Sequence, residues 1–184
     1  MISLTKEAGK NVGLAKRIIE VLKLALEIER KFLVDKRKLY ELNYSSEVKI
    51  AQGYLCGKPT VRVRLKENQA FLTIKSSTGG ISRQEFEYEI PVADGEEILK
   101  LCRRNVLRKI RRTIDYGGHV WEIDFFMGRL AGLVLAEVEL TSVDEQIELP
   151  DWVIKEVSDD PRYFNSNLVK SDREKLGIKK KIPG

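Results

Sequence analysis

The residues best suited to chemistry in this chain are charged side chains that recur at every second position. In residues 26–34, LEIERKFLV, the charged residues Glu27, Glu29 and Lys31 alternate with other side chains. Because successive side chains of a β-strand point to opposite faces, such a segment presents these charges on one face. The same alternation returns along the chain at Arg62 and Arg64, Lys75, Glu85 and Glu87, Lys109 and Arg111, Glu122 and Asp124, and Glu137 and Glu139.

These charged faces have two interpretations. They can be the solvated face of an ordinary antiparallel sheet, whose apolar faces then form the core. Against this, neighbours of like charge, such as Glu137 and Glu139, lie roughly 7 Å apart along a strand and repel each other. Ser, Gln and Asn are also almost absent from these faces. Pairs of like charge are understandable if a ligand supplies the opposite charge.

The chemistry of such a ligand follows from the residue types. Pairs of carboxylates suit hard cations such as Mg²⁺ or Mn²⁺, which take oxygen ligands. Arginine and lysine suit phosphates, arginine through a bidentate fork and lysine as a point charge. A closed barrel lined by both kinds would hold a polyphosphate on a basic wall and a metal ion on an acidic wall. Because buried charges are tolerated only when paired, we expect its interior to be hydrated.

The composition limits the class of protein. A chain of 184 residues with 42% hydrophobic and 33% charged residues suits one domain with a real core. The net charge of +5 is spread along the chain, so no basic arm for nucleic acid is expected. The apolar runs are too short to span a bilayer, and no membrane partner is expected. Two cysteines give no disulfide framework, and the single His119 argues against a zinc site built on histidines, so we expect a cytoplasmic protein.

The periodicity predicts mostly strands. Segments with turn chemistry between them run over 26–34, 48–55, 60–66, 69–76, 83–91, 107–116, 119–126 and 133–141. Helices are predicted over 13–25, over 94–104 from an Asp cap, and over 150–157 from Pro150. Eight strands with short connections indicate an antiparallel barrel or sandwich.

The order of these segments resembles a known family. EIERK at 27–31 matches the ExExK signature of the CYTH superfamily, the triphosphate tunnel metalloenzymes. The resemblance covers about residues 26–170 and continues through QGYL at 52–55, VRVRL at 61–65, LTIKS at 72–76, SRQEFEYEIP at 82–91, RKIRR at 108–112, WEIDFFMG at 121–128, LAEVEL at 135–140 and PDWVIKEVSDDPRYFNSNLV at 150–169. It implies a mainly β fold with flanking helices (α+β), in which an eight-stranded closed antiparallel barrel forms a charged tunnel.

The extent of this resemblance and the predicted N-terminal helix together suggest a division of the chain. Residues 1–25 would be an N-terminal helical extension, 26–170 the tunnel domain and 171–184 a flexible basic tail. The helix over 13–25 would pack against the outer barrel wall or against its equivalent in a second subunit, since amphipathic helices bury their apolar stripe. Residues 159–165, DDPRYFN, would form either a polar plug at one end of the tunnel or an exposed loop.

Site roles are carried over from the family by position. Glu27 and Glu29 would be metal-side carboxylates, and Glu85 and Glu87 would hold metal or orient the attacking water. Predicted catalytic residues are Glu27, Glu29, Lys31, Glu85 and Glu87; predicted phosphate-binding residues are Lys31, Arg62, Arg64, Lys75, Lys109 and Arg111; predicted ligands of Mg²⁺ or Mn²⁺ are Glu27, Glu29, Glu122, Asp124, Glu137 and Glu139.

The favoured function is metal-dependent hydrolysis of inorganic triphosphate to pyrophosphate and phosphate, because the small chain has no added domain for RNA or a nucleoside. An adenylyl cyclase, or a nucleoside or thiamine triphosphatase, could use the same tunnel. From another class, a polyphosphate-binding module without turnover is also open. The expected partner is a small-molecule triphosphate, and a homodimer is compatible with the chain.

Overall fold

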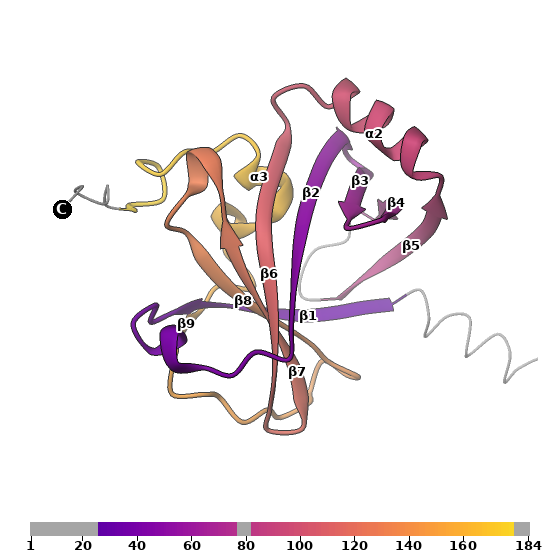
Figure 1. The fold of residues 1–184 in the computed structure, drawn as a ribbon. Coiled ribbons are helices and arrows are strands. Elements are labelled where there is room, and N and C mark those ends of the chain that lie inside the picture. Colours follow the sequence, from indigo (N-terminus) through magenta and orange to yellow (C-terminus); the bar gives the residue numbers. More distant parts are fainter. Residues whose placement is uncertain (1–25, 77–81, 179–184) are drawn as a thin grey trace, which may run out of the picture.

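The protein is built almost entirely from strands. The computed structural model describes residues 26–76 and 82–178, so the predicted helix over 13–25 lies outside the described residues. The strands are β1 (Leu26–Val34), β2 (Ser46–Gly57), β3 (Thr60–Lys66), β4 (Gln69–Lys75), β5 (Ser82–Ile90), β6 (Val106–Tyr116), β7 (His119–Phe126), β8 (Val134–Glu139) and β9 (Val153–Glu156). The helices are α2 (Val92–Leu101) and α3 (Asn165–Leu168), with 3₁₀ turns at Lys38–Glu41, Gly128–Leu130 and Pro161–Tyr163 (Figure 1).

The strands form one antiparallel sheet that curls round on itself. Their order is β5-β4-β3-β2-β6-β7-β8-β1-β9, and β5 also pairs with β1. That second pairing spans three register pairs, from Leu26 opposite Gln84 to Ile28 opposite Ser82. It brings the ends of the eight-stranded order together, so the predicted antiparallel tunnel barrel is confirmed, with a short closure at this seam.

The strand connections follow the turn chemistry of the sequence. Between β6 and β7, Gly117 and Gly118 have φ angles of 59° and 79°, and Tyr116 faces His119 across the hairpin. Two consecutive left-handed residues form the tight turn that matches the twist of a hairpin, and glycine adopts them without strain. The DYGG signal therefore sets the register of the longest hairpin.

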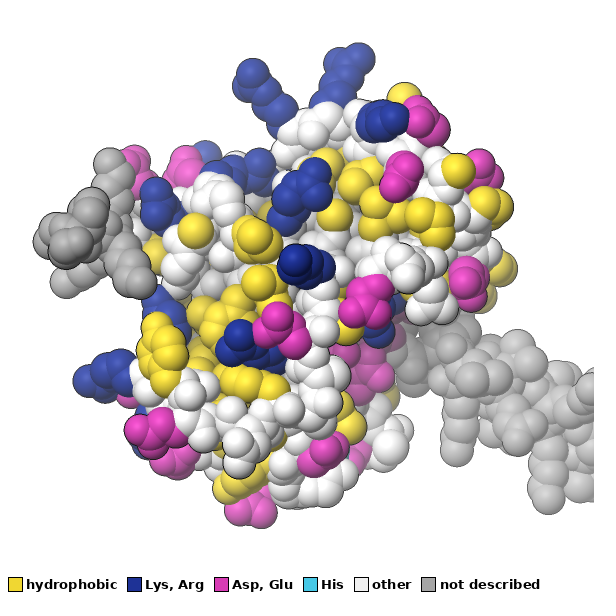
Figure 2. All heavy atoms as spheres, in the orientation of Figure 1, with side chains coloured by type: hydrophobic (Ala, Val, Ile, Leu, Met, Phe, Trp, Pro, Cys, Tyr) yellow, Lys and Arg dark blue, Asp and Glu magenta, His cyan; other side chains and the backbone are white. Residues whose placement is uncertain are grey.

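The main hydrophobic core lies outside the barrel wall. Trp121 of β7 is fully buried between Phe32 of β1 and Trp152, with ring centroids 5.4 and 5.2 Å apart. A second cluster on the outside joins α2 to the sheet through Val63, Leu99 and Cys102. Hydrophobic side chains also reach the visible surface between the charged ones, near α2 among other places (Figure 2). The charged positions that alternate with this core are thereby turned inward.

Two predicted helices differ from the structure. The segment predicted as a helix over 150–157 is a turn followed by strand β9, so that prediction was wrong. Beyond the seam with β5, β1 has a free edge, and β9 pairs there from Phe32 opposite Glu156 to Val34 opposite Val153. The predicted helix over 94–104 is α2, which begins at Val92 after Pro91 and ends at Leu101, so Asp94 is not its cap.

None of the helices in the described ranges has the length and apolar character needed to cross a membrane.

Candidate functional site

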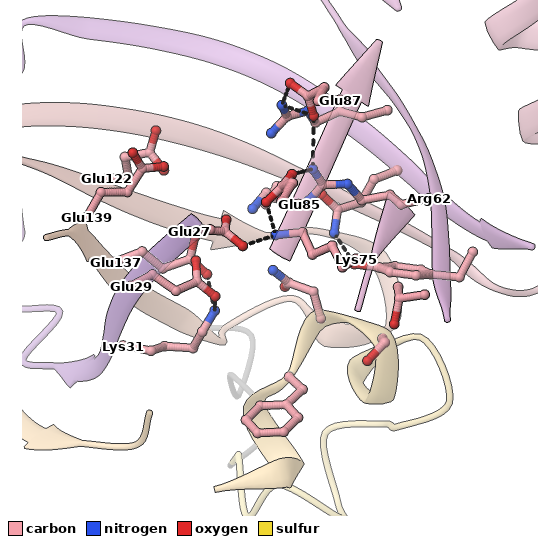
Figure 3. A pocket seen from close by; sticks show the side chains of 18 of the residues that line it. Glu27, Glu29, Lys31, Arg62, Lys75, Glu85, Glu87, Glu122, Glu137 and Glu139 are labelled. Carbon is pink, nitrogen blue, oxygen red and sulfur yellow. Dashed lines mark hydrogen bonds and ion pairs between the residues drawn. The ribbon is translucent and has the colours of Figure 1, made fainter. Parts of the chain in front are cut away.

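The inward-facing side chains of the barrel enclose a cavity of about 420 Å³. Strands β1 to β8 position most of the lining, because each contributes side chains of one alternation phase. Of the predicted site residues, the lining includes Glu27, Glu29, Lys31, Arg62, Arg64, Lys75, Glu85, Glu87, Lys109, Arg111, Glu122, Glu137 and Glu139 (Figure 3). Asp124 does not line the cavity, and it is fully buried in the wall beside Lys109 and Arg111.

On the β3–β5 side, every cation of the lining is already paired. Lys75 Nζ lies 2.5 Å from Glu27 Oε2 and 2.6 Å from Glu85 Oε2, and it thereby links β1 to β5 across the seam. Arg62 donates to Glu85 and Glu87, both at 3.2 Å. Arg64 donates to Glu87 at 2.8 and 2.9 Å. In Figure 3 these groups gather on one side of the cavity around Lys75.

The β6–β8 side carries a second ionic network. Arg111 donates to both oxygens of Asp124 at 2.7 Å and to Glu137 Oε2 at 2.6 Å, and it also contacts Glu122. Lys31 Nζ donates to Glu137, and Lys109 Nζ donates to Asp124. Although burial opposes ionisation, the charges of Lys31, Lys109 and Arg111 hold the pKa of Glu137 well below its usual range.

The structure does not separate the charges into a basic and an acidic wall, as the sequence analysis expected. The lining in the described part of the chain contains seven carboxylates and six lysines or arginines. They interleave as ion pairs because adjacent strands bring opposite signs side by side: Arg62 on β3 and Glu87 on β5, for example, both bond Thr73 on β4 between them. The tunnel is therefore close to charge balance by itself.

Carboxylates nevertheless outnumber cations on one side of the lining, where Lys31 and Arg111 are bonded among them, and we name this part the acidic side. Figure 3 shows Glu122, Glu139, Glu137 and Glu29 together on the side opposite Arg62 and Lys75. Burial, and then the nearby charges of Glu122, Glu27 and Glu29, raise the pKa of Glu139. Carboxylates gathered in this way suit a hard divalent cation chemically. Within the described ranges, however, no group of three His, Cys, Asp or Glu side chains is already arranged to hold a metal ion.

Several lining residues escaped the sequence analysis. Gln52 and Tyr54 of β2 line the cavity, and the Gln52 side-chain amide donates to the Tyr54 hydroxyl at 2.8 Å. Burial raises the pKa of Tyr54 to about 12, so its phenol stays protonated and can donate a hydrogen bond. The alternation of β2 could have indicated both residues, because Gln52 and Tyr54 are two positions apart and so lie on the same face of the strand. Thr60 also lines the cavity.

The C-terminal region covers one end of the barrel. Ser158, Phe164, Asn165 and Ser166 line the cavity there. At this end the inward-facing side chains of the strands are mostly apolar. They pack with the C-terminal segment in a cluster of Tyr54, Leu107, Phe126, Leu130, Leu133, Leu135, Val157, Tyr163, Leu168 and Val169.

Hydrogen bonds from the Arg129 side chain and further apolar contacts hold this C-terminal cover in place. Arg129 donates to the carbonyl oxygens of Ser171 and Arg104, at 3.0 and 3.2 Å, and to that of Val169. Leu176 and Ile178, from the segment expected to be a flexible tail, pack against the same cluster. Of residues 159–165, Phe164 and Asn165 line the cavity and Tyr163 is buried in the cluster, whereas Asp159, Pro161 and Arg162 are exposed. No periodic pattern in the sequence indicated the lining residues Asn165 and Ser166.

Comparison with known proteins gives consistent matches. The family model of the CYTH domain matches residues 25–169. An inorganic triphosphatase of Acetivibrio thermocellus is 44% identical over 148 residues, which is 79% of this chain and 94% of that protein. An inorganic triphosphatase of Nitrosomonas europaea is 38% identical over 152 residues, 79% of this chain and 97% of that protein. A crystal structure of an inorganic triphosphatase superposes with a TM-score of 0.60 at 33% identity, covering 79% of this chain and 95% of that one.

Proposed function

The chain belongs to the CYTH domain family, and we propose that it hydrolyses inorganic triphosphate to pyrophosphate and phosphate inside its charged tunnel. The observation that carries the proposal is the lining itself: six lysines and arginines face a cavity of about 420 Å³ together with seven carboxylates. Phosphoryl transfer asks a protein mainly to position the phosphates and to neutralise their charge. A narrow cavity with cations on several strands supplies both.

The cations would bind the substrate by exchanging partners. Arg62 and Lys75 are held by Glu85 and Glu27 in the protein alone, and phosphate oxygens would replace those carboxylates. Arginine favours such an exchange because its planar fork fits phosphate and carboxylate equally well. Lys31 and Arg111 would contact the chain of phosphates from the β1 and β6 side. The Tyr54 hydroxyl would add an uncharged hydrogen-bond donor at the end of the barrel that the C-terminal region covers.

The acidic side would hold the divalent cation, which we propose to be Mg²⁺ or Mn²⁺. Carboxylates from three strands meet there, and they are hard oxygen ligands of the kind that these ions take. The proposed ligands are Glu27, Glu29, Glu122, Glu137 and Glu139, with Asp124 supporting them from the wall through Arg111. When bound, the ion would neutralise phosphate charge and lower the pKa of a bound water.

The test of function is phosphate release from inorganic triphosphate with Mg²⁺, Mn²⁺ or Ca²⁺, beside ATP and thiamine triphosphate. We expect Glu29→Gln to lower the turnover by about 100-fold or more, as for loss of a preorganised electrostatic group, with unchanged circular dichroism. The matched control is Glu89→Gln, which removes an exposed carboxylate that lies outside the lining on the same strand as Glu85. Full turnover by Glu29→Gln, or cyclic AMP as the main product from ATP, would contradict the proposal.

A further inference from the structure

The outer wall of strands β3 to β5 carries a block of apolar side chains. Register places Val61, Ile74 and Phe86 in one row across the three strands, and Val63, Leu72 and Tyr88 in the next row. All six point outward, because they alternate with side chains that line the cavity or bond to its lining. A block of six neighbouring aliphatic and aromatic side chains needs a cover, since exposed apolar blocks on soluble domains mark contact sites.

Helix α2 covers only the upper part of this wall. A third row, Leu65, Ala70 and Ile90, lies beneath it. A methyl group added at Gly95 of α2 would lie only 2.5 Å from the Ala70 Cβ, which shows how closely helix and strand approach. The cover does not extend to β5 beyond that row: Phe86 remains 45% exposed and Tyr88 57% exposed. We name the surface of Leu72, Ile74, Phe86 and Tyr88 the β4–β5 outer face.

The chain itself offers an occupant for this face. Twenty-five residues precede Leu26, and Leu26 lies opposite Gln84, one outward position before Phe86. The N-terminal end of β1 therefore lies at the edge of the β4–β5 outer face, beside the first residues of β5 (Figure 1). The last part of the preceding segment, GLAKRIIEVLKLA at 13–25, has apolar residues at helical spacing and polar ones at 16, 17, 20 and 23.

The lengths are compatible. A helix of twelve residues extends about 18 Å, and the five residues of β5 from Gln84 to Tyr88 span roughly 14 Å. We propose that residues 14–25 dock as an amphipathic helix on the β4–β5 outer face, with Leu14, Ile18 and Leu22 against Phe86 and Tyr88. Because this segment continues directly into β1 while it rests on β5, it straps the short β1–β5 seam, where Lys75 also links the two strands across the tunnel.

Disulfide trapping in the chain of residues 1–184 tests the docking. In a Cys56→Ser background, which removes the exposed native thiol, Tyr88→Cys is combined with Leu14→Cys, Ile18→Cys or Leu22→Cys. The matched controls place the second cysteine on the polar side, at Lys16, Glu20 or Lys23. We expect intrachain disulfides to form at least about 10-fold faster with the apolar series. Disulfides only between chains would show that a second copy occupies the face, and equal slow formation in both series would show that nothing does; either result overturns the proposal.

Hydrogen exchange supplies a second readout that needs no cysteine. Ile18→Asp with Leu22→Asp should raise the exchange rate of backbone amides in residues 84–90 by about 10-fold, since an uncovered seam opens more often. Lys16→Asp with Lys23→Asp changes the charge at least as much on the polar side, and it should leave that rate unchanged. Equal protection of residues 84–90 in both double variants would overturn the strap.

Discussion

The arrangement of individual side chains shows which charges are structural. Asp124 is fully buried, and its carboxylate accepts hydrogen bonds from Arg111 and from Lys109. Neither cation can be left alone in the wall without a large desolvation cost. Asp124 therefore acts on the site by holding Lys109 and Arg111 in place. The sequence analysis, by contrast, predicted the same role of metal ligand for Asp124 and Glu122.

Asp124→Asn should destabilise the fold by about 3 kcal/mol, because it removes the carboxylate that pairs with the buried Lys109 and one of the carboxylates that pair with Arg111. The matched control is Asp115→Asn on the same hairpin, where the side chain is exposed; it should change the free energy of unfolding by less than about 0.5 kcal/mol. Urea unfolding followed by tryptophan fluorescence measures both. Equal stabilities of the two variants would show that the wall does not depend on this carboxylate.

Sequence reasoning at this scale could find the charges but not their partners. Alternation places Arg62 and Glu87 on inward faces, since it depends only on the twofold repeat of a strand. Their pairing depends on which strands are neighbours and on their register, which the local sequence does not contain. The expected separation into a basic and an acidic wall failed for this reason. Ser166 escaped because it lies in α3, a helix of four residues that is too short to show a period.

Among the elements, α2 depends on one glycine. Gly95 lies inside the helix, where alanine would ordinarily be preferred by about 1 kcal/mol, yet a Cβ there would meet Ala70 Cβ at 2.5 Å and Leu65 Cδ2 at 3.0 Å. Gly95→Ala should therefore destabilise the protein, by about 1–3 kcal/mol as for an overpacked contact.

The control for Gly95 is Gly57→Ala, since a Cβ at Gly57 meets no atom within 4 Å. Ala70→Gly should restore much of the stability in the Gly95→Ala background, because it removes the atom that the new methyl group meets. Thermal unfolding of these three variants and of the wild-type protein gives the comparison. A gain in stability for Gly95→Ala alone would show that helix propensity outweighs the contact.

The β6–β7 hairpin is tied to the 141–148 segment by a titratable pair. His119 Nε2 lies 2.7 Å from Glu145 Oε1. The bond to Glu145 raises the pKa of His119 above 6.5, and the bonds to His119 and Thr141 lower the pKa of Glu145 to about 2. The contribution of His119 to the stability of the fold is complete below pH 6.5, and it is lost as pH rises through the raised pKa of His119. The glutamate contribution is complete above pH 4.5 and is lost as pH falls toward 2.

The stability difference between the wild-type protein and His119→Asn should therefore be largest between pH 4.5 and 6.5, where both groups are charged in the folded state. It should shrink above pH 7. Urea unfolding at pH 5.5, 7 and 9 measures the difference, and His119→Gln provides a second neutral side chain. A difference that stays constant over this range would show that ionisation of the pair is irrelevant to folding.

Strands β1 to β8 were predictable because each has a period of its own and most are bounded by turn residues, whereas β9 was not. Residues 153–156 are too few to show a period, and they become a strand because β1 offers a free edge beyond its pairing with β5. Such an edge is a property of the assembled sheet. The same reasoning applies to the seam: three register pairs between β1 and β5 follow from the curl of the whole barrel, and no local segment contains that information.

At the scale of the whole molecule, the near balance of charge in the tunnel should couple the binding of triphosphate to the binding of a divalent cation. Seven carboxylates and six cations of the described lining neutralise each other as ion pairs. Triphosphate must take cations from carboxylates such as Glu85 and Glu27, which are then left without their positive partner. A divalent cation offers those carboxylates a new partner. Each ligand therefore removes the cost that the other one creates, and the two should bind with positive coupling.

We expect Mg²⁺ to tighten the binding of a non-hydrolysable imido analogue of triphosphate by about 5- to 150-fold, the usual range of coupling between sites. Calorimetry measures the affinity of the analogue with and without Mg²⁺, after correction for the complex that the two form in solution. By reciprocity the analogue should tighten Mg²⁺ binding by the same factor. Lys75→Met should reduce the coupling, since Glu27 and Glu85 then lack their shared cation before any ligand binds. An analogue affinity that Mg²⁺ leaves unchanged would mean that the ion pairs stay intact when phosphate binds.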